Sequence, residues 1–482
     1  MSMLNKDVLL LILEELQYDS KSLYSCLLVN RTWCETAVPI LWKNPHWKLK
    51  ENGGDIQYLE EKSLNIQCLK EKREKREILQ FNVIISHLSN ETKENLRNQG
   101  INLSTEIQKP LFNYISFCKH LVISKLEEGI SSIKNIKSSK ISILRNEVFK
   151  LFINKNTRFT HLYIPRQFNY HIHLIPGAEY CFSELKYLFC STESTDQNIL
   201  EGLSRISNSI KELVIVPSNN ILGMVKLIEA QKNINYIRFY YYTNTINESF
   251  HKSLENSLIK HADNVRHLNI SWEPITKILS YFVNLISLEM WYIGNWKHLE
   301  NASLPGLKFL KVYWAPSNSL ASLIENTKGN LIEISINCGR DRGDEEAASK
   351  RLIQAIYRNC PKLKYLKILF RNINILELEN LLINCQYLNG LIIVTNFYDM
   401  IDWDNLFKIL AKSSPNSLFK FKFYSYRQIK SDSLKLFFDS WKDRHPMLLQ
   451  TVNDYMTTNY KAGEIIKKRN KNYLEDFEWF HY

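Results

Sequence analysis

The sequence is poor in the residues and motifs on which phosphate and acyl-transfer chemistry commonly depends. Only 14 glycines occur among 482 residues, too few to hide a glycine-rich loop that cradles phosphate. There is no P-loop motif, no Gly-x-Ser-x-Gly nucleophile turn and no His-Glu-x-x-His helix. We therefore expect a chain that is not an enzyme, with no catalytic residues and no bound cofactor.

Metal-ligand and disulfide patterns are also missing. The nine cysteines include no Cys-x-x-Cys pair, which favours free thiols in a reducing compartment over a disulfide framework. His171 and His173 could chelate a metal from one face of a strand. No Cys, Asp or Glu at ligand spacing supports them, so we interpret them as surface histidines and expect no metal site.

Long apolar runs are absent. No run approaches the roughly 18 residues that a membrane-spanning helix needs. The longest run near the start, Val8 to Leu13, has acidic residues on both sides and no small-residue cleavage site after it, which argues against a signal peptide. We expect a cytoplasmic and/or nuclear protein without a membrane partner.

The charge balance is basic but diffuse. The 62 lysines and arginines exceed the 50 acidic residues by 12, and they are spread along the whole chain. The densest run, Glu71 to Glu77, alternates in sign and is typical of a solvated helix. Nucleic-acid binding would need a coherent basic face, and the sequence shows none, so no nucleic-acid partner is expected.

The first 45 residues are, by contrast, rich in apolar residues at helical spacing. Leu4, Val8, Ile12 and Leu16 fall four residues apart and share one helical face. About 40 residues cannot close a stable core without a disulfide, a metal or a partner. The surplus of apolar surface in this small segment therefore implies a partner protein.

Two further helices are expected in this segment. Asp19 or Ser20 is a suitable N-cap for the second helix. Pro39 is expected to open a third, short helix that carries Leu41 and Trp42.

The segment resembles an F-box, a motif that runs Leu-Pro-x-Glu-apolar-Leu and later Val-x-x-x-Trp and Leu-Trp. The positions that match it, in order, are Leu4, Val8, Leu9, Ile12, Leu16, Val29, Trp33, Leu41 and Trp42. Asn5 replaces the usual proline, and Asp7 replaces the glutamate conservatively. Because proline would preset φ at the entry of the first helix, its loss is expected to let that helix fray or to weaken the linker contact. The alternative interpretation is an ordinary N-terminal helical hairpin.

The remainder of the chain contains an internal repeat of the form apolar-x-x-apolar-x-apolar. Eleven units occur, and their middle residues lie 20 to 32 residues apart, close to the 20–29-residue period of leucine-rich repeats. These middle residues are Leu162, Leu188, Leu213, Ile237, Leu268, Leu288, Leu310, Ile334, Leu366, Leu391 and Phe421. Leu121 with Ile123 forms a candidate twelfth unit at the start of the array. Cys360 and Cys385 resemble those of cysteine-containing leucine-rich repeats, which often follow F-boxes.

The array predicts a fold of class α/β, a curved leucine-rich-repeat solenoid of about 11–12 units. The expected domains are an F-box (1–45), a helical spacer and N-terminal cap (46–155), the solenoid (156–424) and a C-terminal cap and tail (425–482). Within the spacer, Ile78 to Leu88 and Pro110 to Phe117 are typical of amphipathic helices.

Residues that flank each middle position are expected to point outward on the concave face. They combine aromatic and cationic side chains, as protein-binding hot spots do. The candidate substrate-binding residues are Tyr163, Tyr187, Tyr236, Arg238, Tyr240, Trp291, Phe309, Lys311, Tyr313, Tyr365 and Lys367. Alternatively, tyrosines occupy these positions because they suit strands.

The F-box resemblance implies the substrate-recognition subunit of a Skp–cullin–F-box ubiquitin ligase. The helices would dock on a Skp-family linker protein and, through it, on a cullin, while the repeats would bind an unknown protein substrate of acidic or phosphorylated character. The alternative is a ubiquitin-independent interaction scaffold with a drifted F-box. Asn5 is the one residue that favours this alternative.

Overall fold

The computed structural model describes residues 5–45, 66–103, 109–133, 136–192, 196–217, 222–240, 248–291, 297–337, 346–395 and 400–453. The chain divides into two compact units, Met1–Ser271 and Trp272–Tyr482. Leu4 and the tail from residue 454 onward lie outside the described residues.

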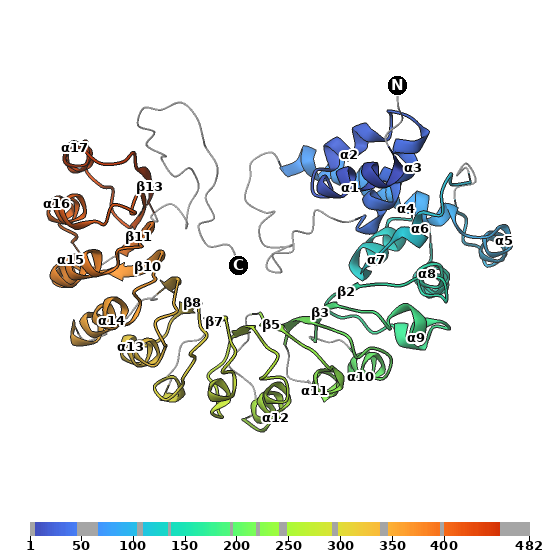
Figure 1. The fold of residues 1–482 in the computed structure, drawn as a ribbon. Coiled ribbons are helices and arrows are strands. Elements are labelled where there is room, and N and C mark those ends of the chain that lie inside the picture. Colours follow the sequence, from blue (N-terminus) through green and yellow to red (C-terminus); the bar gives the residue numbers. More distant parts are fainter. Residues whose placement is uncertain are drawn as a thin grey trace. The chain divides into compact units, whose positions relative to one another are not determined.

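The first unit begins with helices and continues with alternating strands and helices (Figure 1). Its elements are α1 (Lys6–Glu15), α2 (Ser20–Cys26), α3 (Arg31–Lys43), α4 (Ile66–Ser86), α5 (Asn90–Asn98), α6 (Tyr114–Phe117), β1 (His120–Val122), α7 (Ile123–Ser132), α8 (Ser138–Phe152), β2 (His161–Ile164), η1 (Ile172–Leu174), α9 (Ala178–Cys181), β3 (Tyr187–Ser191), α10 (Gln197–Ile206), β4 (Glu212–Val216), α11 (Leu222–Ala230), β5 (Tyr236–Phe239), α12 (Glu248–Ile259) and β6 (His267–Ile270).

The second unit continues the alternation of strands and helices. Its elements are η2 (Ile278–Tyr281), β7 (Ser287–Trp291), η3 (Lys297–Leu299), β8 (Phe309–Tyr313), α13 (Ser317–Glu325), β9 (Glu333–Asn337), α14 (Glu346–Asn359), β10 (Tyr365–Phe370), η4 (Asn372–Asn374), α15 (Ile375–Asn384), β11 (Gly390–Thr395), α16 (Trp403–Ser413), β12 (Lys420–Ser425), α17 (Ser431–Ser440) and β13 (Leu448–Asn453).

Within each unit the strands pair in parallel and in chain order, and the predicted middle residues set the register. In the first unit the paired middle residues are Leu121, Leu162, Leu188, Leu213, Ile237 and Leu268. In the second they are Leu288, Leu310, Ile334, Leu366, Leu391, Phe421 and Leu449. All of these except Leu449 are fully or almost fully buried. The repeat pattern therefore predicted β1 to β12 correctly, including the candidate first unit at Leu121, but it did not predict β13 with Leu449.

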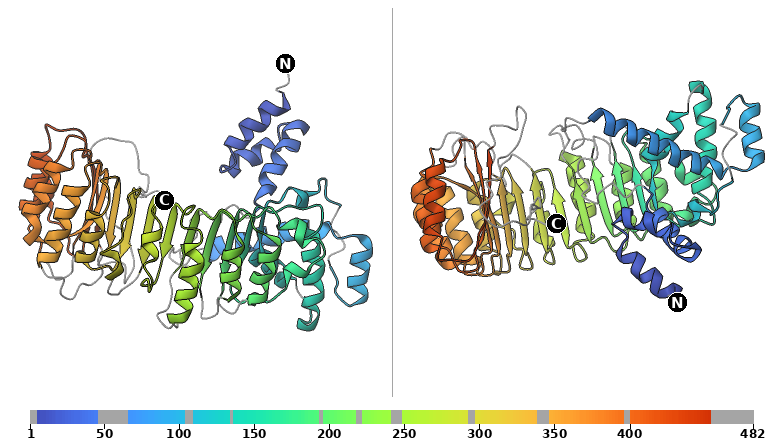
Figure 2. Two further views of the ribbon diagram at one scale, coloured as in Figure 1. Left: turned by 60° about the horizontal axis from the view of Figure 1, so that its bottom comes forward. Right: turned by 90° about the horizontal axis from the view of Figure 1, so that it is seen from above.

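In the first unit α8 to α12, and in the second unit α13 to α17, lie along one side of the strands (Figures 1 and 2). Strand residues alternate in burial, as in β2, β8 and β10, because one face packs on the helices and the other does not. This arrangement is an α/β architecture of the leucine-rich-repeat type. The opposite strand faces carry the residues that the sequence analysis selected as candidates for binding.

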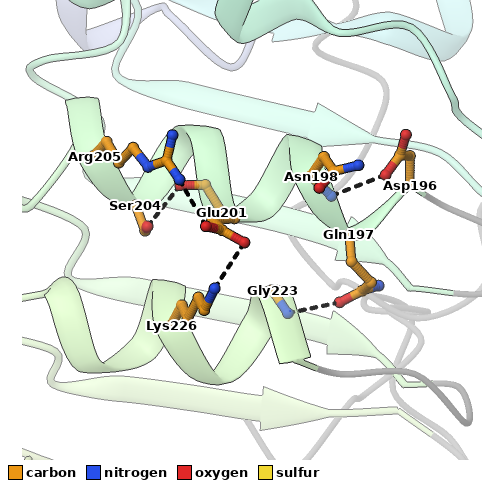
Figure 3. A network of polar contacts seen from close by, with 8 residues as sticks. All are labelled: Asp196, Gln197, Asn198, Glu201, Ser204, Arg205, Gly223 and Lys226. Carbon is orange, nitrogen blue, oxygen red and sulfur yellow. Dashed lines mark hydrogen bonds and ion pairs between the residues drawn. The ribbon is translucent and has the colours of Figure 1, made fainter.

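Polar contacts tie neighbouring repeats together at the helix layer, as α10 and α11 show (Figure 3). Glu201 accepts contacts from Arg205 at 2.7 Å and from Lys226 of the next helix at 2.8 Å. The Gly223 N–H donates to Oε1 of Gln197 at 3.1 Å. A Cβ on Gly223 would lie 2.3 Å from the backbone oxygen of Gln197, so only glycine permits this close approach.

Three expectations about local structure were wrong. Pro39 lies inside α3 rather than at its start, because the Asn30 side chain caps that helix by accepting from the Trp33 N–H at 3.0 Å. In the segment 110–117 only Tyr114–Phe117 is helical. His171 and His173 lie at and within the 3₁₀ helix η1, not on a strand, and His171 Nε2 lies 2.8 Å from the Asp196 carboxylate.

Candidate protein-interaction surfaces

The N-terminal helices expose an unusually apolar surface for so small a unit. Leu28 is 89% exposed and Leu11 65%, while Val8 and Ile12, one helical turn apart on α1, are 44% and 43% exposed. Val29 is also exposed. We call these five residues the N-terminal apolar face. No described residue of the chain covers them, which is the arrangement expected of a surface that docks on another protein.

A separate set of side chains holds the three helices together. Leu9, Leu13 and Leu23 are buried with Cys26 and Ala37. Partly buried side chains pack against them, namely Leu16, Leu27, Trp33, Ile40 and Leu41. The structure thus divides the residues that match the F-box. Val8, Ile12 and Val29 lie at the surface, whereas Leu9, Leu16, Trp33 and Leu41 belong to the interior.

Trp42 belongs neither to the exposed set nor to the interior of the three helices. It joins these helices to the rest of the first unit. Its ring packs on Tyr114 of α6 at a tilt of 31°, with the ring centroids 4.7 Å apart. The neighbouring Lys43 carbonyl accepts from the Lys119 N–H at 2.8 Å, directly before β1. The predicted role of Trp42 in linker binding is therefore joined by an observed packing role within the chain.

Asn5 does not leave the first helix without a start signal. It is the N-cap of α1, and its side-chain oxygen accepts from the Asp7 N–H at 3.2 Å. Its φ of −56° is close to the value of about −65° that proline would fix. Asn5 thus supplies a capping hydrogen bond and a similar φ where proline would preset the dihedral, while fraying of α1 and a weaker linker contact stay predictions.

The uncovered strand face of the first unit carries a ladder of aromatic rings. His120 and His161 stack with centroids 3.8 Å apart, and His161 continues to Tyr187 at 5.3 Å. Tyr163 lies 5.2 Å from Tyr187, which is itself only 9% exposed. Farther along, Tyr236 packs near His267, Phe189 near Tyr240, and the Arg238 guanidinium lies 5.3 Å from the Tyr240 ring. The predicted residues of this face therefore do come together, although Tyr187 is largely covered by its neighbours.

Sequence analysis missed the two histidines at the start of this ladder. Burial, the adjacent His161 and then Lys43 lower the pKa of His120 to about 3. Burial, with Lys43 and Lys186, lowers the pKa of His161 to about 4. Both rings are therefore neutral at pH 7, which allows them to stack without charge repulsion. The signal that could have identified them is their position, since each histidine directly precedes a middle residue of the repeat, Leu121 or Leu162.

The neutral, stacked pair of His120 and His161 predicts that the folded protein loses stability in acid. Because the folded-state pKa lies below the ordinary value of about 6.5, the unfolded chain binds more protons below that pH, and stability is lost as the pH falls through this window. We expect His120 to remove about 2 kcal/mol of stability between pH 7 and pH 5. Urea titrations at both pH values should show a loss that is about 2 kcal/mol smaller in His120→Phe than in the wild type, because His161 keeps its own lowered pKa in the variant. The control, exposed His445→Phe, should keep the wild-type pH dependence, and an unchanged slope in His120→Phe would contradict the assignment.

The strand face of the second unit begins with an aromatic pair and an ion pair. Trp291 and Tyr313 stack with centroids 3.5 Å apart. Lys311 lies 3.2 Å from the Glu289 carboxylate and within 6.0 Å of both rings. Burial opposes the charged form of Lys311, but Glu289 and Tyr313 together outweigh burial, so the pKa of Lys311 is raised. The predicted cation Lys311 is thus already matched by an anion from the neighbouring strand.

Glu333 lies between the predicted residues Phe309 and Tyr365 in the register of this face. Burial raises the pKa of its carboxyl to about 7, although Lys311 acts to lower it. Glu333 is therefore only partly ionised at neutral pH. Sequence analysis did not single it out, because its surroundings depend on two neighbouring strands.

The far part of the same face is cationic. We call Tyr365, Lys367, Lys420, Lys422 and Tyr424, on β10 and β12, the lysine–tyrosine patch. Each of the three lysine ammonium groups lies 4.9–5.7 Å from the centroid of one of the two tyrosine rings. These distances are within the range of cation–π attraction. All five side chains are half-buried, so their polar ends reach the surface.

Neither metal nor thiol chemistry is evident in these surfaces. Among the described residues, no group of three or more His, Cys, Asp or Glu is placed to hold a metal ion. The repeat cysteines Cys360 and Cys385 are buried, and burial raises the pKa of Cys385 to about 12. They act as packing residues rather than nucleophiles. None of the described helices has the length and apolar character that crossing a membrane requires.

Comparison with known proteins gives only weak likenesses. No family model matches the chain, and no curated protein matches its sequence. The crystal structure of the leucine-rich repeat-containing protein LegL7 from Legionella pneumophila aligns over 67% of this chain and 89% of that chain, with 11% identity and a TM-score of 0.30. The crystal structure of the Rad7 and Elc1 complex in yeast aligns over 83% of this chain and 94% of that chain, with 11% identity and a TM-score of 0.31. At this level neither likeness carries an argument about function.

Proposed function

We propose that this protein is a non-catalytic adaptor of a Skp–cullin–F-box ubiquitin ligase. The N-terminal apolar face would dock on a Skp-family linker, and the uncovered strand faces would hold a target protein. The protein itself supplies no reacting group and no cofactor. Its contribution would be proximity, since a held target has a high local concentration at the enzyme that the cullin recruits.

One observation carries the proposal. The N-terminal positions that match the F-box fall into a buried set that closes a three-helix core and an exposed apolar set that nothing in the described chain covers. A helical hairpin that only capped the repeats would direct its apolar residues toward them. Instead, Leu28 and Leu11 are among the most exposed large apolar side chains of the described residues. Solvent exposure of such side chains is unfavourable unless a partner removes them from water.

The alternative, a scaffold independent of ubiquitin, had Asn5 as its support in the sequence. That support is weaker in the structure, because Asn5 caps α1 and adopts a φ close to that of proline. A drifted F-box is expected to lose either its core or its exposed apolar positions. Here both sets are present, and this favours the ligase adaptor.

The proposal predicts that charge on the N-terminal apolar face blocks linker binding. We expect Val8→Glu with Ile12→Glu to weaken binding to a Skp-family linker about thirtyfold, since two apolar contacts of about 1 kcal/mol each are replaced by charges at the interface. The measurement is titration calorimetry of the full-length protein with purified linker, followed by recovery of the cullin in a pull-down.

The matched control is Leu111→Glu with Leu174→Glu, which adds the same charge at two other exposed leucines of the first unit. This control should bind the linker as the wild type does. Circular dichroism should show an unchanged helix content in both double variants, because all four side chains are exposed. If wild type binds neither linker nor cullin, the ligase proposal is wrong.

A further inference from the structure

We propose that the lysine–tyrosine patch binds a short run of negatively charged side chains in a partner polypeptide. The proposal deepens the proposed function, because it assigns the chemistry by which a target would be recognised. It narrows the binding surface from the whole concave face to three strands of the second unit. The shared chemistry is an anionic side chain, carboxylate or phosphate, on an extended peptide.

The first argument is the composition of the uncovered face over β10 to β13. The register aligns Lys367 of β10 and Lys422 of β12 on either side of Ile392, and it aligns Tyr365 and Lys420 on either side of Gly390. The other residues of these rows are Leu369, Val394, Tyr424, Leu448, Gln450 and Val452. Among the described residues of these rows there are three lysines and no acidic residue, so the charge of the rows complements an anion.

The second argument is that contacts with the tyrosine rings restrict the lysine side chains. Tyr424 has two ammonium groups near its ring, Lys422 at 4.9 Å and Lys367 at 5.3 Å from the centroid. Lys420 lies 5.7 Å from the Tyr365 ring and 5.5 Å from the Phe419 ring. Aromatic contact reduces the freedom of long lysine side chains before a ligand arrives. An anion placed between two ammonium groups on one ring would also relieve their mutual repulsion.

The third argument is the limited width of the cationic region across the strands. Toward β9 the face carries Glu333, and at β7 and β8 Glu289 already neutralises Lys311. The cationic region thus spans only β10 to β12, about 10 Å across the strands at the usual spacing of about 4.8 Å. A long polyanion such as RNA would run past the three lysines onto β7 to β9, where the predicted cation Lys311 already pairs with Glu289. A run of two to four anionic side chains in a peptide fits the available width.

The test uses the full-length protein and a fluorescein-labelled dodecapeptide with four central glutamates in a Gly-Ser background. Fluorescence anisotropy should show binding that weakens as salt is raised, whereas the same peptide with four glutamines should not bind. A third peptide carries two phosphoserines in place of the glutamates, and a single-stranded RNA 12-mer serves as the competing class. Binding by either anionic peptide supports the proposal, and their ratio shows whether carboxylate or phosphate is preferred.

The decisive comparison is Lys367→Glu with Lys422→Glu against Lys408→Glu with Lys435→Glu. The control pair makes the same change in net charge at exposed positions of α16 and α17. The patch variant should weaken peptide binding tenfold or more, and the control less than twofold. Equal effects of the two pairs, no binding of either anionic peptide, or tighter binding of the RNA through the same lysines would overturn the proposal.

This experiment is separable from the test of the adaptor role. The patch lies in the second unit and the N-terminal apolar face in the first. Loss of linker binding with retained peptide binding would contradict only the proposed function. Linker binding by a wild type that binds neither anionic peptide would contradict only the patch.

Discussion

Phe437→Ala is expected to lower the free energy of unfolding of the second unit by about 4 kcal/mol. Phe437 is fully buried in α17. Its ring stacks on Phe407 at 4.7 Å and meets Phe421 edge-on at 5.5 Å and Trp441 at 5.7 Å. Truncation would leave a cavity that these three rigid rings cannot fill by small shifts, so the cost belongs to the high range for core substitutions. Urea denaturation followed by tryptophan fluorescence measures it.

The control is Phe438→Ala, one residue farther along the same helix and only half-buried. It should cost no more than about 1 kcal/mol, because less surface returns to water. The same aromatic cluster supports β12, since Phe421 and Phe423 are both strand residues. Hydrogen exchange in β12 should therefore increase in Phe437→Ala and not in Phe438→Ala. Equal losses of stability in the two variants would contradict the assignment of Phe437 to a tightly packed aromatic core.

The repeat pattern predicted the strands β1 to β12 because the middle position of each strand must be apolar. Each strand residue at a middle position is enclosed by its own helix and by two neighbouring strands, so it must be apolar, and its spacing survives loops of different length. Leu121 illustrates this, because it pairs with Leu162 although 41 residues separate them. The last strand was missed for the same reason. Around Leu449, Pro446 and Thr451 occupy the positions where the pattern expects apolar residues.

The sequence predicted which residues lie on the strand face, but not which of their charges meet. Alternation along a strand shows which side chains avoid the helices, and it correctly placed Tyr163, Tyr313 and Tyr365 there. It does not show which charges meet, because that depends on the register between strands. Lys311 meets Glu289 across two strands whose residues are 22 positions apart. The lysine–tyrosine patch likewise becomes visible only when β10 and β12 are aligned through β11.

At the N-terminus the sequence could not show which apolar side chains are buried, because burial there depends on how the helices pack. Leu11 and Leu13 are equally apolar and lie in the same helix, yet one is 65% exposed and the other fully buried. The matched positions gave the order of residues but not the direction of each side chain. In the structure α3 packs on both α1 and α2, and these contacts decide which side of α1 is interior.

Leu13→Ala is expected to destabilise the three N-terminal helices by about 3 kcal/mol. Leu13 has no exposed surface and packs with Leu9 and Leu23 in a core of few residues, so a cavity there cannot be shared with a larger interior. Hydrogen exchange should accelerate throughout α1 and α3, while β3 to β5 keep the protection of the wild type. Leu11→Ala, in the same helix, should change stability by less than about 0.5 kcal/mol.

The two leucine variants also separate folding from recognition. Leu11→Ala should keep the protected helices of the wild type and yet lose linker affinity severalfold, because it removes an exposed contact from the N-terminal apolar face. Leu13→Ala should lose affinity only to the extent that the helices open, and saturating linker should restore their protection by mass action. Loss of affinity in Leu13→Ala without faster exchange would show that the interior assignment is wrong. Unchanged affinity in Leu11→Ala would instead remove this leucine from the docking surface and confine that surface to Val8, Ile12, Leu28 and Val29.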